Sequence, residues 1–191
     1  MGATHFSGPV APTAGHVCSP NPAISPFDPV ANTVATQFRT YNSVTLTDGT
    51  DTAFSTTLHF ITRVFVPHNC TLTGIGYLIG SVGGTDKVIV ELKDSAGVSL
   101  ANSSTSGVTV GTAATMQSVP FTATIDVAGP AYYLLVVSAN GATAKLRTIP
   151  AATMEASTTI AGSVTSTALT VAAVTPPTTF TADKGPIAFT Y

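Results

Sequence analysis

The feature that most constrains the fold is a period-two alternation of apolar and polar residues, which recurs from about residue 41 to residue 150. In KVIVELK at residues 87–93, the apolar residues 88, 90 and 92 alternate with Lys87, Glu91 and Lys93, which we expect to face solvent. Neighbouring side chains of a β-strand point to opposite faces, so this pattern predicts half-buried strands. Turn signals, such as DSAG and Gly129-Pro130, separate about seven or eight such segments. The sequence therefore predicts an all-β fold, an antiparallel β-sandwich or jelly roll over residues 41–150.

Two of these segments carry side chains that could have a function. TTLHFITRVFVP at residues 56–67 is apolar on both faces and predicts a central strand, in which His59 is expected to face solvent or an interface. In YYLLVV at residues 132–137, Tyr132 and Tyr133 could line a sugar-binding groove, although their apolar neighbours favour packing in the core.

Glycines 74, 76 and 80 lie in a further strand segment. A dinucleotide-binding glycine motif would be followed by a helix, and here none is predicted. We interpret these glycines as strand bulges or as points where other groups come close to the backbone.

The C-terminal segment, residues 151–191, is rich in Thr and Ala and has a weak pattern. Its first residues are expected to form a loop or a single turn. One interpretation of the rest is a strand pair, TTIAGSVTS (158–166) with TALTVAAVT (167–175), followed by a terminal strand PIAFTY (186–191). A weak pattern specifies little register, so a neighbouring subunit could supply the missing pairing by strand addition.

The N-terminal segment, residues 1–40, has prolines at positions 9, 12, 20, 22, 26 and 29. Proline lacks a backbone donor and keeps the preceding residue extended, so neither a helix nor a central strand is expected here. Apolar residues recur through the segment, which a purely flexible linker would not need. We predict an extended arm that docks on a partner.

Charge is scarce in this chain: Asp, Glu, Lys and Arg make up 8% of the residues and the formal net charge is −2. Soluble domains average about 25% charged residues, so this composition suits a surface that neighbouring subunits cover. Direct nucleic-acid binding is not expected, because no basic patch is available for phosphates. No apolar run is long enough to span a bilayer and no secretory signal is recognisable, so we expect synthesis in the cytoplasm.

Motifs for chemistry are equally scarce, and we expect neither an enzyme nor a cofactor. The chain has no Gly-x-Ser-x-Gly nucleophile elbow, and DGTD at residues 48–51 favours a turn over a calcium loop. A weak zinc candidate is the set His16, Cys18, His68 and Cys70, because residues two apart share a face of a strand. Two unrelated thiols, or a bridge between Cys18 and Cys70, are the alternatives.

The stretch ATHFSGPV at residues 3–10 resembles the N-termini of small structural proteins of tailed bacteriophages, including capsid decoration (cement) and head-fibre proteins. The resemblance implies a virion protein on the outer capsid surface, typically a homotrimer, that binds the major capsid protein and clamps neighbouring capsomers. It also implies that an arm comprising Thr4, His5, Phe6, Ser7, Gly8, Pro9 and Val10 contacts the capsid or a sister subunit.

The alternative function is a carbohydrate-binding module of a phage fibre or a cell-surface adhesin. β-sandwiches serve both functions, so the fold does not discriminate between them. An exposed aromatic platform would favour the module, and the absence of Trp argues against it.

Overall fold

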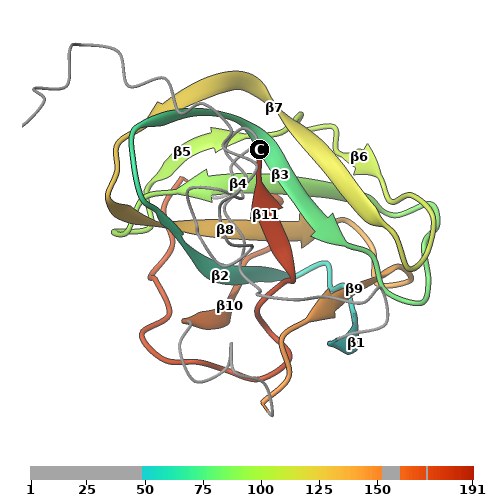
Figure 1. Cartoon of the computed structure of the whole chain (residues 1–191). Coiled ribbons are helices and arrows are strands. Elements are labelled where there is room, and N and C mark those ends of the chain that lie inside the picture. Colours follow the sequence, from blue (N-terminus) through green and yellow to red (C-terminus); the bar gives the residue numbers. More distant parts are fainter. Residues whose placement is uncertain (1–48, 152–159, 171) are drawn as a thin grey trace, which may run out of the picture.

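The computed structural model describes residues 49–151, 160–170 and 172–191, and this part of the chain is all-β (Figure 1). Within it, no helix is long and apolar enough to cross a membrane. The strands are β1 (Thr50–Ala53), β2 (Leu58–Val66), β3 (Cys70–Leu78), β4 (Lys87–Lys93), β5 (Ser99–Asn102), β6 (Val108–Thr109), β7 (Met116–Val127), β8 (Ala131–Ala139), β9 (Lys145–Thr148), β10 (Ala161–Thr165) and β11 (Ala188–Thr190).

The larger sheet has the order β10-β2-β8-β4-β5, with β6 also paired to β4, and all its pairs are antiparallel. The predicted central strand is therefore confirmed, because β2 lies between β10 and β8. A smaller sheet has the order β11-β3-β7, and β1 pairs with β9.

The two main sheets pack face to face, which confirms the sandwich. One large apolar cluster fills the space between them and contains Phe60 and Leu135 from the larger sheet and Ile75 and Val119 from the smaller one. These side chains are buried. Burying apolar surface contributes about 25 cal/mol per Å², so this shared core is the main source of stability.

Two expected turns differ in what they connect. DSAG closes a hairpin between β4 and β5, in which Asp94 accepts backbone hydrogen bonds and Gly97 has a φ of 86°. Gly129-Pro130 also makes a turn, but β7 and β8 do not pair across it, because β7 belongs to the smaller sheet and β8 to the larger. The turn is therefore a crossing between the two layers.

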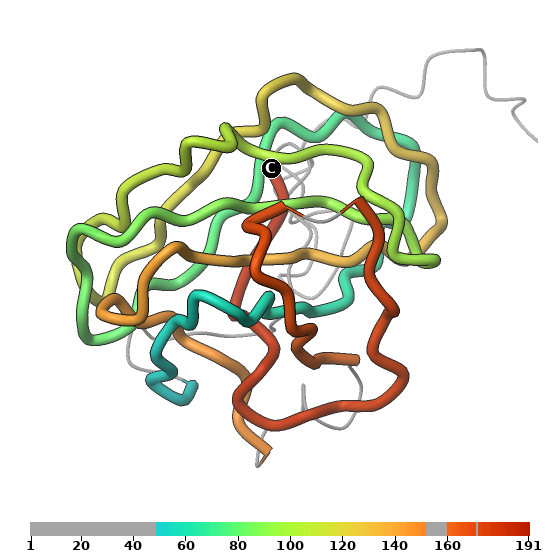
Figure 2. Tube along the Cα trace, turned by 180° about the vertical axis from the view of Figure 1, so that it is seen from behind, coloured from blue at the N-terminus to red at the C-terminus, as the bar shows by residue number. Residues whose placement is uncertain are grey.

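The interpretation of the C-terminal segment as a strand pair is wrong. Residues 161–165 do form β10, but β10 pairs with β2, whose open edge offers it a complete ladder. Residues 166–170 and 172–180 instead cross the outer face of the larger sheet to β5 and return to β10 (Figure 2). The predicted terminal strand is confirmed as β11, which pairs with β3.

The glycines of β3 allow two aromatic rings to approach the backbone of the smaller sheet. Phe189 is paired with Gly76, and a Cβ atom at Gly76 would overlap the Phe189 ring. Likewise, a Cβ at Gly74 would overlap the phenol of Tyr191. The interpretation of these glycines as points of close approach is confirmed, and they fix where β11 docks.

We predict that Gly76→Ala lowers the free energy of unfolding by about 1–3 kcal/mol, because the new methyl group displaces the Phe189 ring from a packed site. Urea denaturation monitors this change. Gly111→Ala is the matched control, since a Cβ there would meet no atom closer than 3.6 Å. Equal stabilities of the two variants would contradict the prediction.

Candidate interaction surfaces

The residues predicted from the N-terminal stretch, Thr4 to Val10, lie outside the described residues. So do His16 and Cys18, two members of the weak zinc candidate. Within the described ranges, no three His, Cys, Asp or Glu side chains gather closely enough to hold a metal ion.

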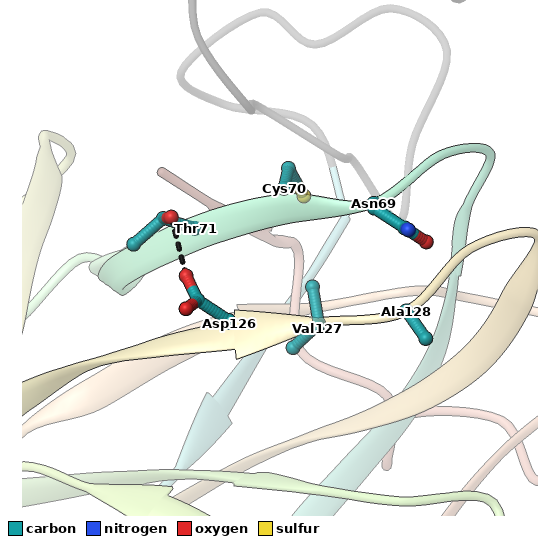
Figure 3. A pocket seen from close by; sticks show the side chains of 6 residues that line it. All are labelled: Asn69, Cys70, Thr71, Asp126, Val127 and Ala128. Carbon is teal, nitrogen blue, oxygen red and sulfur yellow. Dashed lines mark hydrogen bonds between the residues drawn. The ribbon is translucent and has the colours of Figure 1, made fainter.

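Of the other two members of that candidate, Cys70 is the first residue of β3 and His68 precedes this strand. Cys70 is a free, half-buried thiol beside a shallow hollow of about 480 Å³, which is also lined by Asn69, Thr71 and Asp126 (Figure 3). The hydroxyl of Thr71 donates a hydrogen bond of 2.5 Å to Asp126. Burial, and secondly the charge of Asp126, raise the pKa of the Cys70 thiol. The thiol is therefore protonated and weakly nucleophilic at neutral pH.

Two aromatic side chains are exposed on the outer face of the larger sheet. Phe65 on β2 and Tyr132 on β8 are directly paired across the strands, 45% and 47% exposed, and their ring centroids are 5.1 Å apart. The guanidinium carbon of Arg63 lies 4.3 Å from the centroid of the Tyr132 ring. We call Arg63, Phe65 and Tyr132 the aromatic patch.

The expectation that Tyr132 and Tyr133 pack in the core is correct for only one of them. Tyr133 packs in the core as expected and is 7% exposed, with its hydroxyl donating to the carbonyl of Ala128 at 2.7 Å. Tyr132 points the other way, because neighbouring residues of a strand alternate. Arg63 covers part of the Tyr132 ring and interacts with its π-electrons. The patch therefore offers apolar ring edges and one cation.

The rest of this face is covered by the crossing segment, which we call the strap (residues 166–170 and 172–180). At the start of the strap, Ser138 on β8 donates to the carbonyl of Leu169 at 2.9 Å. Near the middle of the strap, Val174 packs on Ile61, Leu134 and Val136. The strap therefore converts a half-exposed sheet face into a second, smaller core.

His59 lies under the strap. We expected it to face solvent or an interface, and the expectation that it faces solvent is wrong. It is 2% exposed, and its Nε2 lies 2.7 Å from the carbonyl oxygen of Ala168. Since a carbonyl only accepts, Nε2 carries a proton and donates it. His59 thus helps to hold the strap against the sheet.

Glu91 and Lys93 are buried under the same strap, with exposed fractions of 1% and 0%. The alternation places them on the outer face of β4 as expected, but that face is not in solvent. Lys93 Nζ lies 2.8 Å from Glu91 Oε2, which also accepts from the Ser99 hydroxyl at 3.3 Å. Glu91 Oε1 is 3.9 Å from His59 Nδ1. A buried ion pair replaces the expected solvated charges.

A second ionic contact holds β1 against β9. Asp51 accepts hydrogen bonds from the backbone and hydroxyl of Ser81 and from Lys145 Nζ at 3.0 Å. Burial opposes ionisation of Asp51, but these hydrogen bonds and the Lys145 charge outweigh it and lower its pKa from 3.8 to about 2. Asp51 therefore makes a structural contact from within strand β1, and Asp48 of the DGTD stretch lies outside the described residues.

We did not anticipate the aromatic patch or the buried ion pair from the sequence. The sequence did indicate part of the patch, because both faces of residues 56–67, which include Phe65, are apolar. It did not indicate that Phe65 meets Tyr132, which lies far away in the chain. Nothing in the sequence indicated the ion pair, since the strap that buries it shows no regular alternation of apolar and polar residues.

We predict that Lys93→Met lowers the free energy of unfolding by about 3 kcal/mol, because Glu91 loses its cation in a buried site. The double variant Glu91→Leu/Lys93→Met should lose less than Lys93→Met alone, since it leaves no buried charge from this pair. Chemical denaturation measures both, with exposed Lys87→Met as the control. A double variant less stable than Lys93→Met would contradict the prediction.

We also predict that Asp51 makes stability depend on acid pH. The stabilisation by ionised Asp51 is fully present above pH 4 and disappears as the pH falls towards 2, because its pKa is lower in the folded state. At pH 6, Asp51→Asn should be about 1–2 kcal/mol less stable than the wild type, allowing for solvent screening. The deficit should shrink towards zero at pH 2 in denaturation curves. A deficit independent of pH would contradict this.

Comparisons of the chain with protein-family models, curated proteins and solved structures gave no match. A functional interpretation therefore depends on the composition, on the N-terminal stretch and on the surfaces described above.

Proposed function

We propose that this chain is a structural virion protein that binds the outer surface of a tailed-phage capsid. In this proposal it is a homotrimer that contacts the major capsid protein and clamps neighbouring capsomers. It performs no chemistry, uses no cofactor, and interacts with neither nucleic acid nor membrane. The protein is synthesised in the host cytoplasm and becomes part of the outer surface of the virion.

The observation that carries this proposal is the distribution of charge. Only 8% of the residues are charged, and two of them, Glu91 and Lys93, are buried under the strap. The exposed surface therefore has even fewer charges than the composition implies. A surface so poor in charge suits contact with other subunits better than free solution.

The N-terminal arm would supply the attachment. Ordering a backbone costs about 1–2 kcal/mol per residue, so a long arm needs a large contact area to remain bound. Prolines lower this cost because they restrict the free arm beforehand. The resemblance of residues 3–10 to phage structural proteins assigns capsid contact to Thr4 through Val10. A jelly-roll connectivity for the body belongs to the same proposal.

The carbohydrate-binding module remains a second candidate, because the structure does have exposed aromatic rings at Phe65 and Tyr132. Two features make this candidate weaker. The rings are tilted by 51° to each other, so they form no flat platform. Arg63 also occupies part of the Tyr132 ring that a sugar would stack against.

We predict that deleting residues 2–12 abolishes capsid binding, because the deletion removes Thr4–Val10 and leaves the folded body intact. The measurement is co-sedimentation with undecorated particles of the phage that encodes the chain. Gly111→Ala in the full-length chain is the control for a tolerated change. The deletion variant should keep the wild-type unfolding curve and oligomeric state, and its binding at wild-type affinity would overturn the proposal.

A further inference from the structure

The strap is anchored at both of its ends, and the two anchors lie close together. Its first residue, Ser166, donates its backbone N–H to the carbonyl of Thr57 at 2.9 Å. Just beyond its last residue, the N–H of Thr181 donates to the carbonyl of Ala161 at 2.8 Å. Ala161 begins the five-residue strand β10 and Ser166 follows it, so one short strand separates the anchors. A surface loop whose ends are this close can move without pulling on the strands that flank it.

Between these anchors, few contacts hold the strap on the larger sheet. Val174 is the only buried residue among the strap residues that the structure describes. The cluster in which it packs is much smaller than the cluster between the two sheets. Segments with few buried apolar contacts open at a lower free energy than the core. Hydrogen bonds attach the first half of the strap to the sheet: His59 to the carbonyl of Ala168, Ser138 to that of Leu169, Ser99 N–H to that of Ala172, and Val174 N–H to that of Gly97.

The charged pair beneath the strap lowers the cost of opening it. Glu91 and Lys93 are almost fully buried, and burial removes the hydration of both ions. The two residues belong to the same strand, β4, so lifting the strap leaves them together and returns water to them. The regained hydration offsets part of the cost of exposing the apolar residues around Val174.

We propose that the strap is a lid that opens as a unit while both sheets stay folded. Opening breaks the contacts of Val174 and the hydrogen bonds of the first half of the strap. Strands β10 and β11 stay in place, because the two anchors remain closed. The open lid uncovers the apolar residues of β2 and β8 beneath Val174, which lie beside the aromatic patch on the same face. The closed lid therefore hides most of a continuous apolar face. This inference does not depend on the capsid proposal.

Residue-resolved hydrogen exchange of the full-length chain tests this opening. The amides of Val174 and Ser99 are bonded between the strap and the turn and strand beside it, so they exchange only when the lid opens. The amide of Leu135, in the central strand β8, reports unfolding of the sheets. Val174 and Ser99 should exchange about tenfold faster than Leu135 or more, because the local opening exposes less of the core. Low urea should speed exchange at Leu135 much more than at Val174, since the denaturant slope follows the surface exposed.

A matched pair of variants tests the contact that closes the lid. Val174→Ala removes the buried side chain of the strap and should speed exchange at Ser99 about tenfold. Val82→Ala is the control, because Val82 is 37% exposed and lies outside the strap, and it should leave exchange at Ser99 nearly unchanged.

Three results would overturn the proposal. If Val174 and Ser99 exchange as slowly as Leu135, with the same dependence on urea, the strap opens only when the sheets unfold. If they exchange as fast as in an unstructured peptide, the strap is not a closed lid. If Val82→Ala and Val174→Ala change exchange at Ser99 equally, Val174 does not close it. The first two results need only the wild-type chain, so the test holds even if Val174→Ala fails to fold.

Discussion

The structure depends on burying the larger sheet on both of its faces. The smaller sheet covers the inner face, and Phe60 and Leu135 pack there against Ile75 and Val119. The strap covers most of the outer face, where Val174 packs on Ile61 and Val136. A sheet buried on both sides needs apolar residues on both faces of its strands, which explains why β8 is a nearly continuous apolar run and why β2 has apolar residues on both faces.

The strap also explains why two charged side chains are buried. Glu91 and Lys93 sit on a face that solvent would normally reach, and the strap places them in a site where each stabilises the other. Replacing such a pair by apolar residues of similar volume is often neutral or favourable, so its burial is not in itself a source of stability. It gives the strap, which has little pattern of its own, a defined place to dock through Ser99 and His59.

The strap leaves one end of the sheet open, and the aromatic patch lies there. The buried charges make the body surface poorer in charge, and the patch adds exposed apolar area at a single place. Both properties favour association between subunits over free diffusion.

The sequence by itself determined several strands, because alternation and turn residues act between near neighbours: β2, β4, β8 and β11 lie where the pattern predicts them. It also determined that Gly74 and Gly76 are points of close approach. Only the tertiary structure decided which sheet β7, β8 and β10 join, that the strap buries His59, Glu91 and Lys93, and that Phe65 meets Tyr132. These outcomes depend on contacts between residues far apart in the chain, and a local period carries no information about which distant segment covers a given face.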